Sequence, residues 1–79
     1  SVMETHKKNN SERLKGEEIY VGQLVKSEEV GYGTVLDKKF EQHQTPISLD
    51  YYCIWMVLIL SDCGDVTWYD VDFVWFYPV

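Results

Sequence analysis

The chain changes from polar to strand-like at Ile19. Residues 1–18 contain three aliphatic side chains, which follow neither a helical nor a strand period. So little apolar surface cannot offset the conformational entropy that ordering this segment would cost. We therefore expect a flexible polar tail over residues 1–18 and one folded domain over residues 19–79.

Beyond the tail, five runs of apolar, β-branched and aromatic residues are separated by turn signals. The runs cover residues 19–25, 34–36, 51–60, 66–69 and 73–77. Gly31 and Gly33 favour a turn after the first run, because glycine adopts positive φ without steric cost. Pro46 excludes a helix from the loop at residues 42–50, and Ser61–Gly64 fits a type I turn with a glycine bulge. This spacing is typical of a small barrel or sandwich.

The run at residues 51–60 consists of ten nonpolar or aromatic residues without a polar interruption. Alternate side chains of a strand point to opposite sides, so both faces of this strand would be apolar. One face would carry Tyr51, Cys53, Trp55, Val57 and Ile59, and the other Tyr52, Ile54, Met56, Leu58 and Leu60. A five-stranded barrel buries only one face, which leaves a patch on the order of several hundred Å². Either the tail or the loop at residues 41–50 covers this patch, or another chain does.

The apolar runs and glycines follow a recognisable order along the chain. Val21–Val25 comes first, then Gly31–Val35, then a strand centred on Trp55, and finally Gly64–Tyr69. This order resembles that of small SH3-like barrels of the KOW and Tudor type, and in particular the short barrel proteins of tailed bacteriophages. The resemblance covers residues 19–79. It implies an all-β, five-stranded SH3-like barrel, from a superfamily whose members bind proteins, peptides or nucleic acids and are rarely enzymes.

Charge and aromatic side chains are unevenly distributed. The chain has 7 basic and 13 acidic residues, a net charge of −6, and no basic residue after Lys39. Nine of its 12 aromatic residues follow position 50. A protein that works mainly by neutralising phosphates needs a basic face, so the composition argues against nucleic acid as the main partner. The acidic, aromatic half should instead meet a basic or an apolar partner.

These observations predict a non-enzymatic, phage-encoded protein–protein interaction module. An aromatic and aliphatic surface of the C-terminal half would mediate self-association or the docking of an unidentified partner. The residues expected to carry this surface are Trp55, Met56, Leu58, Trp68, Tyr69, Trp75 and Tyr77. We expect a homo-oligomer in the cytoplasm of an infected cell, or alternatively a component of the virion.

Three other kinds of binding fit parts of the sequence. An acidic mimic of nucleic acid would inhibit a host nucleic-acid-binding protein through Asp50, Asp62, Asp65, Asp70 and Asp72. Weak nucleic-acid binding would instead use the tail together with Lys38 and Lys39. A cage of Tyr32, Trp68 and Tyr69 would hold a cationic ligand, because ring faces attract cations; the alternative role of these rings is packing.

Catalytic, metal and membrane signals are missing from the sequence. It contains no nucleophile elbow, phosphate loop or Ser/His/Asp arrangement, and its histidines and cysteines lack metal-ligand spacing. We expect no enzyme activity, no metal and no cofactor. The longest uncharged run, Tyr51–Ser61, is too short to span a bilayer, and no signal-peptide pattern is present.

The two cysteines are expected to remain unlinked. With the hairpin turning at Asp62–Cys63, Cys53 would lie on the order of 20 Å away along its strand, whereas a disulfide needs Cα atoms within about 7 Å. Cys63 would be an exposed thiol at the turn, and Cys53 a small hydrophobic residue of the core.

Overall fold

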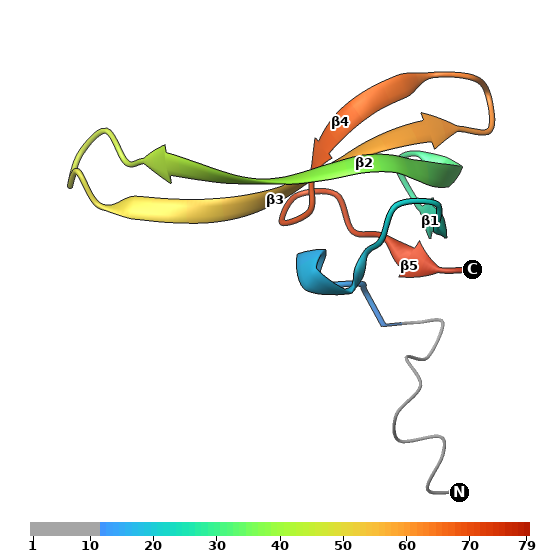
Figure 1. The fold of residues 1–79 in the computed structure, drawn as a ribbon, viewed down its shortest axis with the longest axis horizontal. Coiled ribbons are helices and arrows are strands. Elements are labelled where there is room, and N and C mark those ends of the chain that lie inside the picture. Colours follow the sequence, from blue (N-terminus) through green and yellow to red (C-terminus); the bar gives the residue numbers. More distant parts are fainter. Residues whose placement is uncertain (1–11) are drawn as a thin grey trace, which may run out of the picture.

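The computed structural model describes residues 12–79, which form one five-stranded antiparallel sheet (Figure 1). The strands are β1 (Leu24–Ser27), β2 (Gly31–Gln44), β3 (Tyr51–Ser61), β4 (Val66–Asp70) and β5 (Tyr77–Pro78), preceded by the 3-10 turn η2 (Gly16–Glu18). Their order across the sheet is β4-β3-β2-β1-β5, so a meander of four strands is followed by a fifth that returns to pair with the first. The prediction of a small all-β fold with five strands is confirmed.

The turn between β3 and β4 forms as the sequence predicts. Ser61 accepts the N–H of Gly64 at 3.0 Å, and its own N–H donates to the carbonyl of Asp65 at 2.8 Å. Gly64 has φ of 95°, a left-handed conformation that side-chain-bearing residues adopt only at a steric cost. The glycine therefore sets the geometry that lets β4 fold back along β3.

β2 is much longer than the sequence analysis predicts. The predicted loop at residues 42–50 is wrong over residues 42–44, because β2 continues to Gln44 after a bulge between Val35 and Asp37. Its polar residues remain in the strand because each of them pairs with a residue of β3, as far as the Gln44–Tyr51 pair. Cross-strand pairing here overrides the low strand propensity of charged residues.

The last predicted strand is shorter than expected. Of residues 73–77, only Tyr77 belongs to β5. The carbonyl of Asp70 accepts the N–H groups of Phe73 and Val74, at 3.1 and 2.9 Å, and so closes a turn. The prediction of a strand over residues 73–76 is therefore wrong, although Phe76 still delivers a fully buried ring to the core.

The core lies on one side of the sheet, called the inner face below. Its buried residues are Leu14, Ile19, Val25, Val35, Val57, Ile59, Val71, Val74 and Phe76. β3 contributes Val57 and Ile59, which decides which of its two apolar faces is inside. The opposite side, called the outer face, carries Tyr52 and the even-numbered residues of β3 that follow it.

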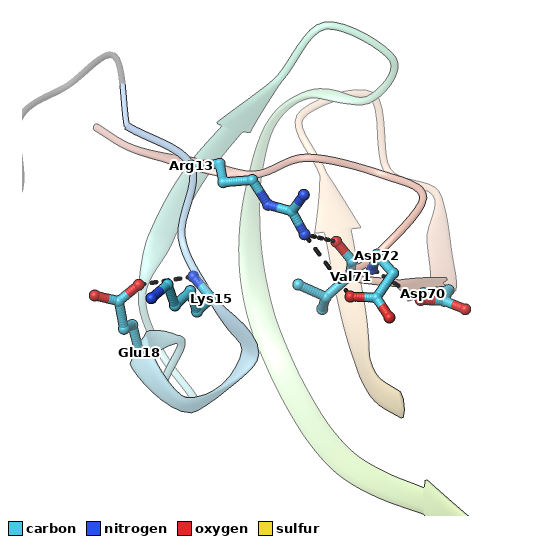
Figure 2. Close-up of polar contacts among 6 residues, drawn as sticks. All are labelled: Arg13, Lys15, Glu18, Asp70, Val71 and Asp72. Carbon is cyan, nitrogen blue, oxygen red and sulfur yellow. Dashed lines mark hydrogen bonds and ion pairs between the residues drawn. The ribbon is translucent and has the colours of Figure 1, made fainter. Parts of the chain in front are cut away.

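The ordered part of the chain begins before the predicted boundary at Ile19. Leu14 is buried in the core, and its N–H donates to the carbonyl of Phe76 at 2.7 Å. Beside it, a guanidinium nitrogen of Arg13 donates to the carbonyl of Val71 at 3.0 Å and lies 3.8 Å from a carboxylate oxygen of Asp72 (Figure 2). The predicted tail is thus wrong for residues 12–18, and its remainder, residues 1–11, lies outside the described residues.

One lysine attaches this N-terminal segment to the sheet. The ammonium of Lys38, on the inner side of β2, donates to the carbonyls of Gly16 at 3.0 Å and Ile19 at 2.6 Å. The same ammonium lies 4.4 Å from the centre of the Trp55 ring. Gly16 packs directly on Trp55, and a Cβ at this position would collide with the indole. Lys38 and Trp55 together hold η2 against β2 and β3.

Replacing Lys38 should therefore loosen the N-terminal segment. We expect Lys38→Met to lower the free energy of unfolding by about 1–3 kcal/mol, because two carbonyls lose a charged donor. Urea unfolding followed by tryptophan fluorescence measures this loss. Lys26→Met, which removes an ammonium from β1, is the matched control; an equal loss in both variants would contradict the role given to Lys38.

Candidate interaction surfaces

The outer face of the sheet carries an apolar strip along β3 and its neighbour β4. We call this strip the outer apolar surface; its residues are Tyr52, Ile54, Met56, Leu58, Leu60, Val66 and Trp68. The pairs Leu58–Trp68 and Leu60–Val66 stand directly opposite each other across the two strands. Tyr52 is 47% and Leu60 38% exposed, and the side chains between them are half-buried. No described segment of the chain lies over this strip as η2 and the C-terminal turn lie over the inner face (Figure 1).

A charged side chain, Lys39, covers part of the outer apolar surface. The ammonium of Lys39 lies 4.3 Å from the centre of the Trp68 ring and 3.0 Å from a carboxylate oxygen of Glu41. Because β3 runs between β2 and β4, the Lys39 side chain has to cross β3 to reach Trp68. Long lysine stems commonly cover apolar surface while their charge stays in water. Such a cover can move away when a partner arrives.

Glu41 connects this lysine to a histidine farther along β2. Its carboxylate lies 3.0 Å from Nε2 of His43, whose ring stacks on Tyr52 with the centroids 5.5 Å apart. The hydrogen bond from Lys39, followed by that from His43, lowers the pKa of Glu41 below its ordinary value. The row of side chains therefore holds Glu41 ionised beside the apolar strip.

The Glu41 titration tests this row. Since the pKa of Glu41 is lowered by folding, its contribution to stability is present above its unfolded pKa and is lost as pH falls through the folded pKa. We expect Lys39→Met to move the NMR-measured pKa of Glu41 upward, toward that of an ordinary glutamate. Lys26→Met should leave it in place. An unchanged Glu41 pKa in Lys39→Met would show that the lysine does not contact this carboxylate in solution.

Beyond the core, β2 and β3 continue alone as a two-stranded projection (Figure 1). We call residues 39–56 the arm. β1 pairs with β2 only as far as Thr34, and β4 pairs with β3 only as far as Met56. A two-stranded hairpin is marginally stable in water unless something packs on it. The arm therefore depends on its own cross-strand contacts, or on another molecule.

The arm exposes apolar side chains on both faces and at its tip. Phe40 is 57% exposed although it packs on Trp55 at 4.6 Å, and Tyr51 is 65% exposed. In the connecting turn, Ile47 is 96% and Leu49 65% exposed. Leu49 also has φ of 63°, which a leucine adopts only at a cost. Residues 12–79 leave these side chains exposed, so they are available to a binding partner.

Both cysteines are free and exposed. Cys63 lies at the β3–β4 turn, as predicted, with its sulfur 3.2 Å from the hydroxyl of Ser61. The prediction that Cys53 belongs to the core is wrong. Cys53 is on the inner side of β3, but β3 extends past the last residue that covers that side.

The seven predicted surface residues lie at three different places. Met56, Leu58 and Trp68 belong to the outer apolar surface. Trp55 and Tyr69 point to the inner face, where both pack against the core; the ring of Tyr69 meets that of Phe76 at 5.8 Å. They therefore support the fold and do not share a surface with the first three.

Trp75 and Tyr77 line a third place, a cleft near the C-terminus. The cleft has a volume of about 360 Å³ and is lined by Ser27, Glu28, Glu29, Phe73, Trp75 and Tyr77. Phe73 is 80% and Trp75 50% exposed. The guanidinium carbon of Arg13 lies 4.6 Å from the centre of the Trp75 ring, so this ring already has a cation on it.

The predicted aromatic cage does not form. Trp68 and Tyr69 are consecutive in β4, so their rings point to opposite faces of the sheet. Tyr69 packs against the core, whereas Trp68 lies on the outer face beside Lys39. Two rings separated by the sheet cannot enclose one cation, and this prediction is wrong.

The predicted charged sites are also dispersed. Lys38 lies on the inner face and Lys39 on the outer face, each with its own partners, so the two do not make a basic patch. Among the acids, Asp50 lies in the arm turn, and Asp62 and Asp65 lie in the β3–β4 turn. Asp70 is the last residue of β4, and Asp72 follows the strand. Asp70 accepts the N–H of Asp72 at 2.8 Å, and Asp72 faces Arg13 (Figure 2).

Sequence reasoning missed the arm. Phe40, Tyr51 and Tyr52 become its exposed rings because residues 37–44 pair with residues 51–58. The signal was present in the sequence: two segments of eight residues flank a short turn with Pro46 and Ser48. The charges in the first segment concealed it.

Comparisons with known proteins add no family to this description. A scan against models of protein families and searches of curated proteins and of solved structures found no match to the chain. Within residues 12–79, no group of three or more His, Cys, Asp or Glu side chains could hold a metal ion. In the same residues, no helix is long and apolar enough to cross a membrane. The resemblance to SH3-like barrels stays a prediction.

Proposed function

We propose that the protein is a non-enzymatic protein-interaction module that binds through the outer apolar surface and the arm. The observation that carries this proposal is the second face of β3. Its side chains are apolar from Tyr52 to Leu60, yet the described residues cover only the opposite face. A contiguous exposed apolar patch on a small domain commonly marks a binding site.

Magnitudes indicate that the strip and the arm act together. A half-exposed aliphatic side chain that becomes buried contributes about 1 kcal/mol, whereas association costs at least about 4 kcal/mol. The seven residues of the outer apolar surface, most of them already half-buried, would only slightly exceed that cost. The exposed rings of Phe40 and Tyr51 lie on the inner side of the arm, so a partner gains their area only when it also contacts that side of the projection.

The charges around the strip suggest the chemistry of the partner. Glu41 and Asp70 border the outer apolar surface, and the chain as a whole has a net charge of −6. A partner with apolar side chains flanked by lysine or arginine would complement this arrangement. From the resemblance of the sequence, we further propose that the domain is an SH3-like barrel of bacteriophage origin that acts inside the infected cell.

Selection of peptides from a displayed random library tests the proposed surface. We expect the selected peptides to combine apolar and basic residues, and to bind Trp68→Thr roughly tenfold or more weakly than the wild type, because buried tryptophans dominate such interfaces. Trp75→Thr is the matched control, since it removes the same side chain from the C-terminal cleft. Peptides that bind Trp68→Thr as tightly as the wild type would contradict the proposal, as would a library that yields no binders.

A further inference from the structure

One edge of the arm ends in unpaired backbone groups. The ladder between β3 and β4 ends at the pair Met56–Asp70, followed by one more hydrogen bond, from the N–H of Val71 to the carbonyl of Trp55 at 3.1 Å. From there to the tip, β3 has β2 on one side and no described strand on the other.

The direction of that last hydrogen bond identifies the free groups. The carbonyl of Trp55 points away from β2, and the N–H and C=O of alternate residues in a strand point to the same edge. Those of Tyr51 and Cys53 therefore point to the open edge as well, while Tyr52 and Ile54 bond to β2. Each copy of the chain thus offers two donors and two acceptors in a row.

This edge lacks the features that normally keep sheet edges from pairing. Charges, prolines and bulges discourage edge-to-edge contact, and residues 51–56 contain none of them. The opposite edge of the arm is formed by β2, which carries the charged residues Lys39 and Glu41 and is preceded by the bulge between Val35 and Asp37. At the far edge of the sheet, β5 carries Pro78, which has no N–H to offer.

We propose that a second copy of this chain pairs with the open edge of β3 in antiparallel orientation, about a two-fold axis at Tyr52. Tyr51 of each copy then stands opposite Cys53 of the other, and all the free groups of both residues are satisfied. The proposal rests on the proposed function, since it names one partner of the arm. The two arms become one four-stranded sheet, whose outer apolar surfaces lie on the same side.

Several features favour a second copy over an unrelated strand. The paired segment is uncharged, so self-pairing places no like charges opposite each other despite the net charge of −6. The axis brings the two Tyr52 rings together on the outer face, and Asp50 of one copy stands opposite Ile54 of the other. Four strands also relieve the marginal stability of a two-stranded ribbon.

A disulfide placed on the axis tests the pairing. In a Cys53→Ser, Cys63→Ser background, Tyr52→Cys puts two thiols at a non-hydrogen-bonded pair with Cα atoms about 4.5 Å apart, within disulfide range. We expect mild oxidation to convert most of this variant to a covalent dimer. Ile54→Cys in the same background is the matched control, because its two sulfurs would be offset by about 14 Å along the strands; it should stay monomeric.

A second variant tests the hydrogen bonds without adding a crosslink. Cys53→Pro removes an N–H that points to the open edge and leaves the ladder with β2 complete. We expect sedimentation equilibrium to show a dimer dissociation constant raised roughly tenfold or more, because each copy loses a hydrogen bond. Circular dichroism checks that the sheet is retained.

The outcomes separate this inference from the proposed function. Failure of Tyr52→Cys to crosslink, crosslinking of Ile54→Cys to the same extent, or an unchanged dissociation constant in Cys53→Pro would overturn the pairing. The peptide selection is independent of all three, so peptides that depend on Trp68 would still support the proposed surface. Crosslinking of Tyr52→Cys without any selected peptide would support the pairing and contradict the outer apolar surface as a docking site.

Discussion

The structure is governed by a strand with two apolar faces, of which the described residues cover only one. β3 has eleven residues, and its inner face is covered where Val57 and Ile59 meet the core. The residues that cover them come from short segments, namely Leu14, η2 and the turn that leads to Phe76. Past Trp55, the covering segments end while β3 continues.

Lys38 is decisive for where the cover ends. Its ammonium binds the carbonyls of Gly16 and Ile19 and lies over the ring of Trp55, so the N-terminal segment is held at the base of the arm. The arm beyond it is left with exposed rings on both faces. On the outer side, the charged side chain of Lys39 lies against the ring of Trp68 and covers part of it. The fold thus keeps an apolar surface in water without burying it permanently.

The sequence was sufficient for some of this architecture. Gly64 and the residues before it predicted the β3–β4 turn, and the uninterrupted apolar run predicted that both faces of β3 would be apolar. The sequence did not predict which face of β3 would be buried, because that depends on which side of the sheet the distant segments around Leu14 and Phe76 pack against. It also missed the role of Leu14, since a single leucine in a polar segment has no periodicity to reveal it.

Other features depend on pairing, which a single segment does not encode. Residues 37–44 look like a charged loop until residues 51–58 provide the partner strand. Trp68 and Tyr69 are neighbours in the sequence and suggest a shared cation site, but the strand places their rings on opposite faces of the sheet. Trp55 looks like a surface ring until Gly16 packs on it. In each case, contacts between distant residues determine the role of the side chain.

The most direct test of this account is the accessibility of the arm in a single copy of the chain. Hydroxyl-radical footprinting, at a dilution where the protein sediments as a monomer, measures the oxidation of individual rings. The account predicts rapid oxidation of Phe40, Tyr51 and Tyr52 and protection of the fully buried Phe76. Protection of the three arm rings equal to that of Phe76 in the monomer would contradict it, because the surface would then already be covered.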